Sequence, residues 1–167
     1  MRTDMRYAVF NTSAGWIGLL SSEKGLRNVT LPQHSEEAAL GALGRDVAKA
    51  EPAPGAFTEL IERLHAYFRG EWVDFDDRLD LSAGTPFQRA VWMATRRIGY
   101  GQTRTYRWVA GEVGRPLAAR AVGQALGANP LPLVVPCHRV IGSDGGLAGF
   151  GGGLEMKRYL LNLEQGR

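Results

Sequence analysis

The chain contains one cysteine, Cys137, which directly precedes His138 in an apolar segment from Val134 to Val140. A lone thiol cannot form an internal disulfide, and it supplies at most one sulfur to a metal. Cysteine also fills apolar strands, so Cys137 is either inert packing or a nucleophile. Because a free cysteine is only roughly a few per cent thiolate near pH 7, a nucleophilic Cys137 requires a base or a proton relay.

Metal and cofactor chemistry has little support in the remaining residues. His34 and His65 have no cysteine or carboxylate partner at the spacing of metal ligands, so we expect surface or core histidines. The glycine-rich segment 142–153 suits a lid, a linker or close approach to a flat ligand, but it lacks the Gly-Lys-Ser/Thr ending of a phosphate-binding loop. We therefore expect neither a metal nor a cofactor.

The N-terminal residues contain no extended hydrophobic stretch and no small-residue cleavage site. We expect a cytoplasmic protein without a membrane partner, in a compartment that keeps a working thiol reduced. The 44% hydrophobic content is enough for a real core in a chain of 167 residues, so folding should not need disulfides.

Charge is distributed unevenly along the chain. Residues 1–85 hold 9 Lys/Arg and 13 Asp/Glu, whereas residues 86–167 hold 11 and 4, which gives net charges of −4 and +7. Seven arginines fall between Arg89 and Arg120. The second half is therefore the candidate binder of a polyanion, although a solvated basic face would look the same.

Hydrophobic periodicity predicts an α+β fold in two domains, 1–80 and 81–167. The first is a small domain of antiparallel sheet and helices. Its predicted strands are Tyr7–Phe10, Gly15–Leu20, Arg27–Leu31 and Trp72–Phe75. Its predicted helices begin at Ser35, with Val47 on the apolar side, and at Phe57, and a linker at 51–55 separates them.

The second domain is predicted to be mostly helical. Thr85 and Pro86 begin one helix, a short helix starts near Thr105, and Pro116 opens a third helix that is rich in alanine. A tight turn between the last two makes them a helix-turn-helix or winged-helix-like element. A final helix is expected from Leu154 to Glu164.

Several of these motifs together resemble one protein family. The segment Pro136–Val140, the upstream segments 119–123 and 129–130, and the closing segment 157–164 resemble the O6-alkylguanine-DNA alkyltransferases, also called methylated-DNA–protein-cysteine methyltransferases. The match covers residues 85–164, whereas the first half resembles the family only in size and element order. The resemblance implies direct repair of O6-alkylguanine in double-stranded DNA, with O4-alkylthymine as an additional candidate substrate.

The resemblance implies roles for individual residues. Cys137 accepts the alkyl group, His138 deprotonates it through a bound water, and Glu164 orients His138. Transfer of carbon to sulfur gives a stable thioether, and no second thiol exists to resolve it, so one turnover should inactivate the protein.

DNA contacts follow from the same resemblance. Arg120 replaces a nucleotide that is rotated out through the minor groove, and Tyr106 crowds the backbone phosphate. Asn129 links the recognition helix to the active-site strand. The alanines that let the helix lie close are Ala118, Ala119 and Ala121. The substrate pocket is completed by Val140, Phe150 and Gly151.

The sequence also departs from the family pattern. No cysteine precedes Cys137, so the structural zinc site of some members should be absent, and Phe150 stands where many members have tyrosine. We expect a monomer, with cooperative binding on DNA left open. The alternatives are a non-enzymatic alkylated-DNA-binding protein, a helix-turn-helix transcription regulator and a cysteine hydrolase, whose histidine normally comes from a separate segment.

Overall fold

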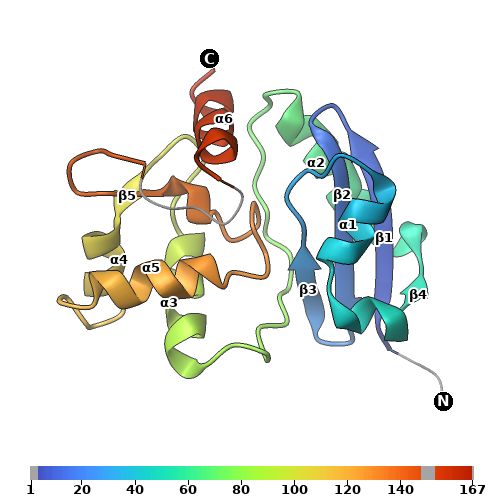
Figure 1. The fold of residues 1–167 in the computed structure, drawn as a ribbon, viewed down its shortest axis with the longest axis horizontal. Helices are drawn as coiled ribbons and strands as arrows, with labels where there is room; N and C mark the ends of the chain where they lie inside the picture. Colours follow the sequence, from blue (N-terminus) through green and yellow to red (C-terminus); the bar gives the residue numbers. More distant parts are fainter. Residues whose placement is uncertain (1–3, 148–152, 167) are drawn as a thin grey trace. The chain divides into compact units, whose positions relative to one another are not determined.

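The computed structural model describes residues 4–147 and 153–166, and it forms two compact units, Met1–Leu81 and Ser82–Arg167 (Figure 1). In the described residues, the first unit combines a sheet with two α-helices and short 3-10 turns, and the second is mostly helical. The α+β fold class that the sequence predicts is therefore confirmed. Among the described residues, no helix is both long enough and apolar enough to span a membrane.

The N-terminal unit is built on a four-stranded sheet with the strand order β3-β2-β1-β4. Strands β1 (Arg6–Thr12), β2 (Gly15–Ser22) and β3 (Gly25–Val29) form an antiparallel meander, and β4 (Glu51–Pro52) pairs parallel to β1. Gly15 and Gly25 begin strands at φ +134° and +139°, a region that favours glycine. These two glycines allow the tight turns that keep the meander compact.

Helices cover this sheet. Helix α1 (Glu36–Ala42) packs on β1 and β2, and α2 (Thr58–Phe68) packs on β1 from behind in the view of Figure 1. The central strand β2 is consequently buried on both faces, with Ile17, Leu19 and Leu20 fully inaccessible to solvent. This covered strand is the centre of the N-terminal core.

Three predictions for this unit are wrong. Residues 72–75 alternate like a strand, yet they belong to neither sheet and form irregular backbone. Glu51–Pro52 was expected to be linker and instead extends the sheet as β4. Helix α1 ends at Ala42 because Gly44 adopts φ +84°, so Val47 lies in a separate 3-10 helix, η1 (Arg45–Lys49).

The described residues of the C-terminal unit form four α-helices and a short parallel ladder. Its helices are α3 (Pro86–Arg96), α4 (Tyr106–Glu112), α5 (Ala119–Gly127) and α6 (Leu154–Glu164). Thr85 and Gln88 form a capping box at the start of α3. Strands β5 (Arg104–Thr105) and β6 (Val140–Ile141) pair in parallel, with Arg104 opposite Val140.

The boundaries of α6 agree with the prediction, whereas α5 begins later than expected. Pro116 does not open that helix, because the Ala118 amide bonds to the Arg115 carbonyl at 2.9 Å and closes a separate turn first. The cysteine-bearing segment is also not a strand. It is a loop that leads into a single 3-10 turn, η3 (Cys137–Arg139).

Candidate active site

Cys137 is the first residue of the η3 turn, and β6 follows that turn directly. The partner strand β5 ends at Thr105, whose side chain caps α4, so Tyr106 is the first residue of that helix. The β5–β6 ladder therefore ties the cysteine turn to the start of the helix-turn-helix. Cys137 itself is buried, with 8% of its surface exposed.

Asn129 organises the loop that precedes the cysteine. It follows the end of α5, donates from Nδ2 to the Val135 carbonyl at 2.9 Å, and accepts from the Leu131 amide at 2.9 Å. The same Val135 carbonyl accepts the Cys137 amide at 2.7 Å. One side chain just after α5 thus fixes the backbone two residues before the thiol.

Glu164 connects the η3 turn to the end of α6 through two buried neighbours. Its Oε2 lies 2.6 Å from His138 Nε2, and its Oε1 accepts Arg139 Nε at 2.8 Å. Arg139 also donates from Nη2 to Oε2 at 3.1 Å and from Nη1 to the Ile98 carbonyl at 2.7 Å. The Gly101 amide adds a bond to Oε1 at 3.1 Å.

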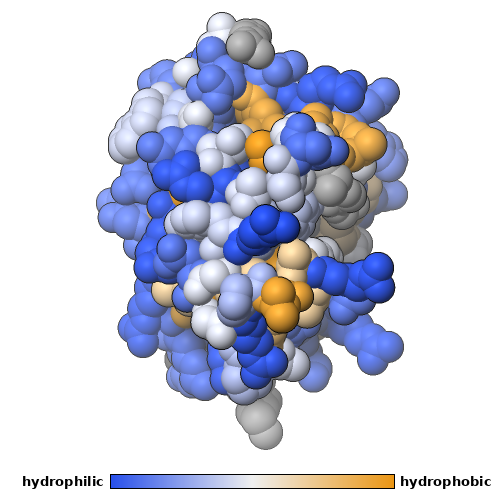
Figure 2. Space-filling model, turned by 90° about the vertical axis from the view of Figure 1, so that its left-hand side faces the viewer, coloured by the Kyte–Doolittle hydropathy of each residue, from blue (hydrophilic) through white to orange (hydrophobic). Residues whose placement is uncertain are grey.

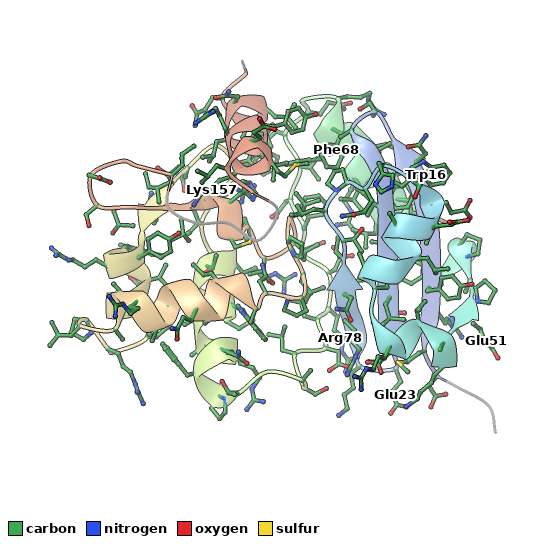
Figure 3. All side chains as sticks on the ribbon, viewed as in Figure 1. Trp16, Glu23, Glu51, Phe68, Arg78 and Lys157 are labelled. Atoms are coloured by element: carbon green, nitrogen blue, oxygen red, sulfur yellow. The ribbon has the colours of Figure 1, made fainter. Side chains whose placement is uncertain are left out.

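Lys157 is a fully buried lysine on α6 (Figure 3). Its ammonium donates to the Val140 carbonyl at 2.7 Å and lies 5.8 Å from the centre of the Tyr106 ring. Gly123 of α5 also faces this ring, because a Cβ there would lie 3.7 Å from a ring carbon. The lysine thereby joins α6, the strand after the cysteine and the first residue of α4.

Burial and these neighbours shift the ionisation of three groups. Burial raises the pKa of the Cys137 thiol, although a hydrogen bond with Asn129 and the charge of Lys157 act in the opposite direction. Burial lowers the pKa of His138 despite the bond to Glu164. Burial alone would raise the pKa of Glu164, but the hydrogen bonds and charges of His138 and Arg139 hold it well below its usual range.

The resting site therefore combines a neutral thiol, a neutral imidazole and an ionised carboxylate. Such a set can take a proton from sulfur onto imidazole while the carboxylate stabilises the resulting cation. Within the described residues, no group of histidine, cysteine, aspartate or glutamate side chains could hold a metal ion.

The helix-turn-helix presents a cationic surface next to this site. Arg120 and Ala121 are exposed on α5, and Ala118 and Ala119 are half-buried at its start. The face that carries α4 and α5 shows small apolar patches among hydrophilic residues (Figure 2). A surface with long arginines beside small alanines suits close approach to a polyanion.

Comparison with family models matches residues 86–166 to the DNA-binding domain of 6-O-methylguanine DNA methyltransferase and residues 5–81 to its ribonuclease-like domain. A relative from Methanosarcina acetivorans named methylated-DNA--protein-cysteine methyltransferase is 42% identical over 160 residues, which is 96% of this chain and 98% of that protein. The chain belongs to the 6-O-methylguanine DNA methyltransferase family. The resemblance inferred from the sequence is thereby confirmed.

Other members of the methyltransferase family extend this finding. The methylated-DNA--protein-cysteine methyltransferase of Mycobacterium tuberculosis (strain ATCC 25618 / H37Rv) is 54% identical over 116 residues, or 70% of each chain. The crystal structure of Mycobacterium tuberculosis OGT in complex with DNA has a TM-score of 0.83 and 42% identity, and it covers 96% of this chain and 93% of that one.

The structure brings most of the sequence-predicted residues of this methyltransferase family member into one region. Cys137, His138, Glu164, Asn129 and Tyr106 are linked to the η3 turn or to its ladder. The carbonyl of the buried Val140 accepts a hydrogen bond from Lys157. Two predicted pocket residues, Phe150 and Gly151, lie outside the described residues.

Sequence reasoning assigned no role to two buried cations of the site, Arg139 and Lys157. Arg139 lies within the cysteine motif, so its position was a signal, but its partner is 25 residues away. Lys157 gave a weaker signal, as a single basic residue three positions before the buried Leu160 on α6. Because lysine is almost never fully buried, the sequence predicts an exposed position for such a residue.

Proposed function

We propose that the protein repairs double-stranded DNA by transferring the alkyl group of O6-alkylguanine to Cys137, irreversibly and once per molecule. The observation that carries this proposal is the placement of the only thiol of the chain on a buried turn, whose next two residues share one carboxylate. The name of its relatives, methylated-DNA--protein-cysteine methyltransferase, supports the same reaction.

The proton relay begins at the thiol. Because burial keeps Cys137 protonated at rest, sulfur must lose its proton as the reaction proceeds. His138 Nε2 faces Glu164, so Nδ1 is the ring nitrogen that receives this proton through a bound water. The carboxylate then stabilises the imidazolium at 2.6 Å, as in a catalytic triad.

In the transfer itself, Sγ forms a bond to the alkyl carbon while the bond between that carbon and O6 breaks. Guanine leaves with the electron pair of the broken bond. The proton that left the thiol ends on guanine through the relay, so the products are a neutral base and a thioether. No further thiol is present in the chain to remove the alkyl group, so each molecule reacts once.

Lys157 supports this step electrostatically. Burial lowers the pKa of Lys157, and the negative charge of the Cys137 thiolate acts in the opposite direction. The positive charge of Lys157 in turn opposes the rise that burial causes in the pKa of Cys137. Formation of the thiolate therefore stabilises the charged form of Lys157, which burial destabilises. Tyr106 lies beside this pair, and burial and the charge of Cys137 both raise the pKa of its hydroxyl, so it remains a neutral donor.

The buried thiol cannot meet an alkyl carbon inside stacked DNA, so the damaged nucleotide must rotate out of the helix. We assign insertion into the vacated space to the exposed Arg120, and close approach of α5 to Ala118, Ala119 and Ala121. Tyr106 would then hold the extruded nucleotide. The structure of Mycobacterium tuberculosis OGT with DNA supports DNA as the partner. Phosphate contacts would make binding largely independent of sequence.

Intact mass measurement tests the proposal. The protein is mixed with a duplex that carries one O6-methylguanine, and a gain of one methyl group is expected, with no gain in Cys137→Ser. Peptide mapping should place the methyl group on Cys137. An unchanged mass with retained binding to the damaged duplex would instead favour the alternative, a non-enzymatic protein that binds alkylated DNA.

A further inference from the structure

Leu117 is the most exposed large apolar residue of the C-terminal unit among those described, with 99% of its surface accessible. It lies in the turn that precedes α5, between Pro116 and the helix N-cap Ala118. Single exposed leucines are common on protein surfaces. This one differs because of its position relative to the helix and to Arg120.

Leu117 occupies the position directly before the N-cap of α5. A hydrophobic residue there usually packs against the fourth residue of the helix and fixes the entry of the chain. The fourth residue of α5 is Val122, which is fully buried, whereas Leu117 points entirely into solvent. This staple is therefore absent, and the leucine side chain contributes nothing to the start of the helix.

The backbone holds Leu117 in this outward position. The Arg115 amide bonds to the Ala110 carbonyl at 2.9 Å, and the Ala118 amide bonds to the Arg115 carbonyl at 2.9 Å. Pro116 fixes one further backbone angle. The leucine is thus presented on a turn that is tied at both ends, so little conformational entropy is lost when it contacts a ligand.

The surrounding charges select the ligand. Arg115 precedes Leu117 by two residues, Arg120 follows it by three, and the chain contains no aspartate or glutamate from Val113 to Ser143. Leu117 and Arg120 are both exposed at the start of α5, three residues apart along the chain. An apolar side chain flanked by exposed arginines fits the minor groove of a duplex, where sugars and opened base steps offer apolar surface between phosphates.

We infer that Leu117 is an apolar DNA contact, which lies in the minor groove next to Arg120 and packs against the deoxyribose or the opened base step beside the extruded nucleotide. This inference rests on the proposed function and adds a residue to it. The leucine stabilises the opened duplex by excluding water, and Arg120 fills the space that the nucleotide leaves.

The test compares Leu117→Ala with the wild type in two alkylation reactions. One substrate is a duplex with a single O6-methylguanine at limiting concentration, and the other is free O6-benzylguanine. We expect Leu117→Ala to react about tenfold more slowly with the duplex, which corresponds to about 1.4 kcal/mol, and at the wild-type rate with the free base. Met93→Ala, which truncates another exposed apolar residue on α3, should match the wild type in both reactions.

Salt dependence separates an apolar contact from a charged one. Leu117→Ala should weaken duplex binding without changing the slope of log affinity against log salt, because no charge is removed. Leu117→Lys should make that slope steeper without restoring the rate of repair. The inference is overturned if Leu117→Ala repairs the duplex at the wild-type rate, or if Leu117→Lys repairs it faster than the wild type.

Two further outcomes are distinguishable from these. If the wild type is alkylated by neither the duplex nor the free base, the proposed function fails instead. If Leu117→Ala melts at a lower temperature than the wild type, or changes the oligomeric state, the leucine serves the fold or a protein contact, and the inference is wrong. Its full exposure predicts an unchanged melting temperature.

Discussion

Replacing Glu164 by glutamine tests the network around the thiol most directly. The substitution keeps the shape of the side chain but turns one acceptor oxygen into a donor NH₂ group. Oε1 currently accepts from Arg139 Nε and the Gly101 amide, and Oε2 faces His138 Nε2 and Arg139 Nη2. In either orientation of the amide, its NH₂ group faces at least one N–H donor of Arg139, and the buried Arg139 loses its anionic partner.

The expected cost follows from these contacts. Removing one partner of a buried ion pair destabilises a protein by about 3–5 kcal/mol, which lowers Tm by roughly 6–20 °C in a chain of this size. Because the pKa of Glu164 lies below its ordinary value, its stabilising contribution is present at neutral pH and is lost as the pH falls below about 4.3. The difference in unfolding free energy between wild type and Glu164→Gln should therefore shrink in acid.

Alkylation should also slow, by about 10²–10³-fold at pH 7, which is within the usual contribution of general base catalysis. An amide NH₂ group facing Nε2 favours the His138 tautomer that carries its proton on Nδ1, and this tautomer cannot accept the thiol proton. The rate should then depend on direct ionisation of Cys137, and it should rise with pH up to the raised pKa of that thiol.

Urea unfolding at pH 7 and pH 3, together with single-turnover alkylation by free O6-benzylguanine between pH 6 and pH 9, measures both effects. Glu155→Gln is the matched control, because Glu155 is exposed on the first turn of the same helix. A Glu164→Gln protein with wild-type stability and an unchanged pH profile would refute the assignment of Glu164 to the relay.

Three further substitutions test other parts of the site. Arg120→Ala should slow repair of the duplex at least tenfold more than alkylation by the free base, and equal losses on both substrates would exclude a role in nucleotide flipping. Lys157→Met should raise the pKa of Cys137 and move the pH profile of free-base alkylation to higher pH, and the wild type should lose its advantage once Lys157 itself deprotonates. An unshifted profile would contradict this electrostatic role. Leu160→Ala removes a fully buried side chain of α6 and should cost about 2–5 kcal/mol in urea unfolding, so a smaller loss would mean that α6 contributes little to the core.

The helices of the second unit could be predicted largely because their signals are local. Thr85 and Pro86 mark the start of α3, and the apolar residues of α6 recur at helical spacing from Leu154 to Glu164. The irregular segment at Trp72–Phe75 could not be predicted, because alternation alone does not supply a partner strand.

The site residues were predictable only where one short motif held them together. Cys137 and His138 are adjacent, and the family resemblance added Glu164. The contact of Arg139 with the Ile98 carbonyl spans 41 residues and depends on how α3 packs, which no local pattern specifies. The burial of Lys157 depends in the same way on the position of the Val140 carbonyl. Both cations become apparent only when the helices are assembled.

Arg139 donates hydrogen bonds to both the Ile98 carbonyl and Glu164, and this has a consequence for redesign of the protein. One guanidinium fastens the ends of two helices to the turn that bears the reactive sulfur, so substitutions intended to retune reactivity through that carboxylate will also loosen the scaffold. Directed evolution toward new alkyl donors should therefore accumulate changes around the Tyr106 ring and along α5, and should leave the ion pair of Arg139 and Glu164 unchanged.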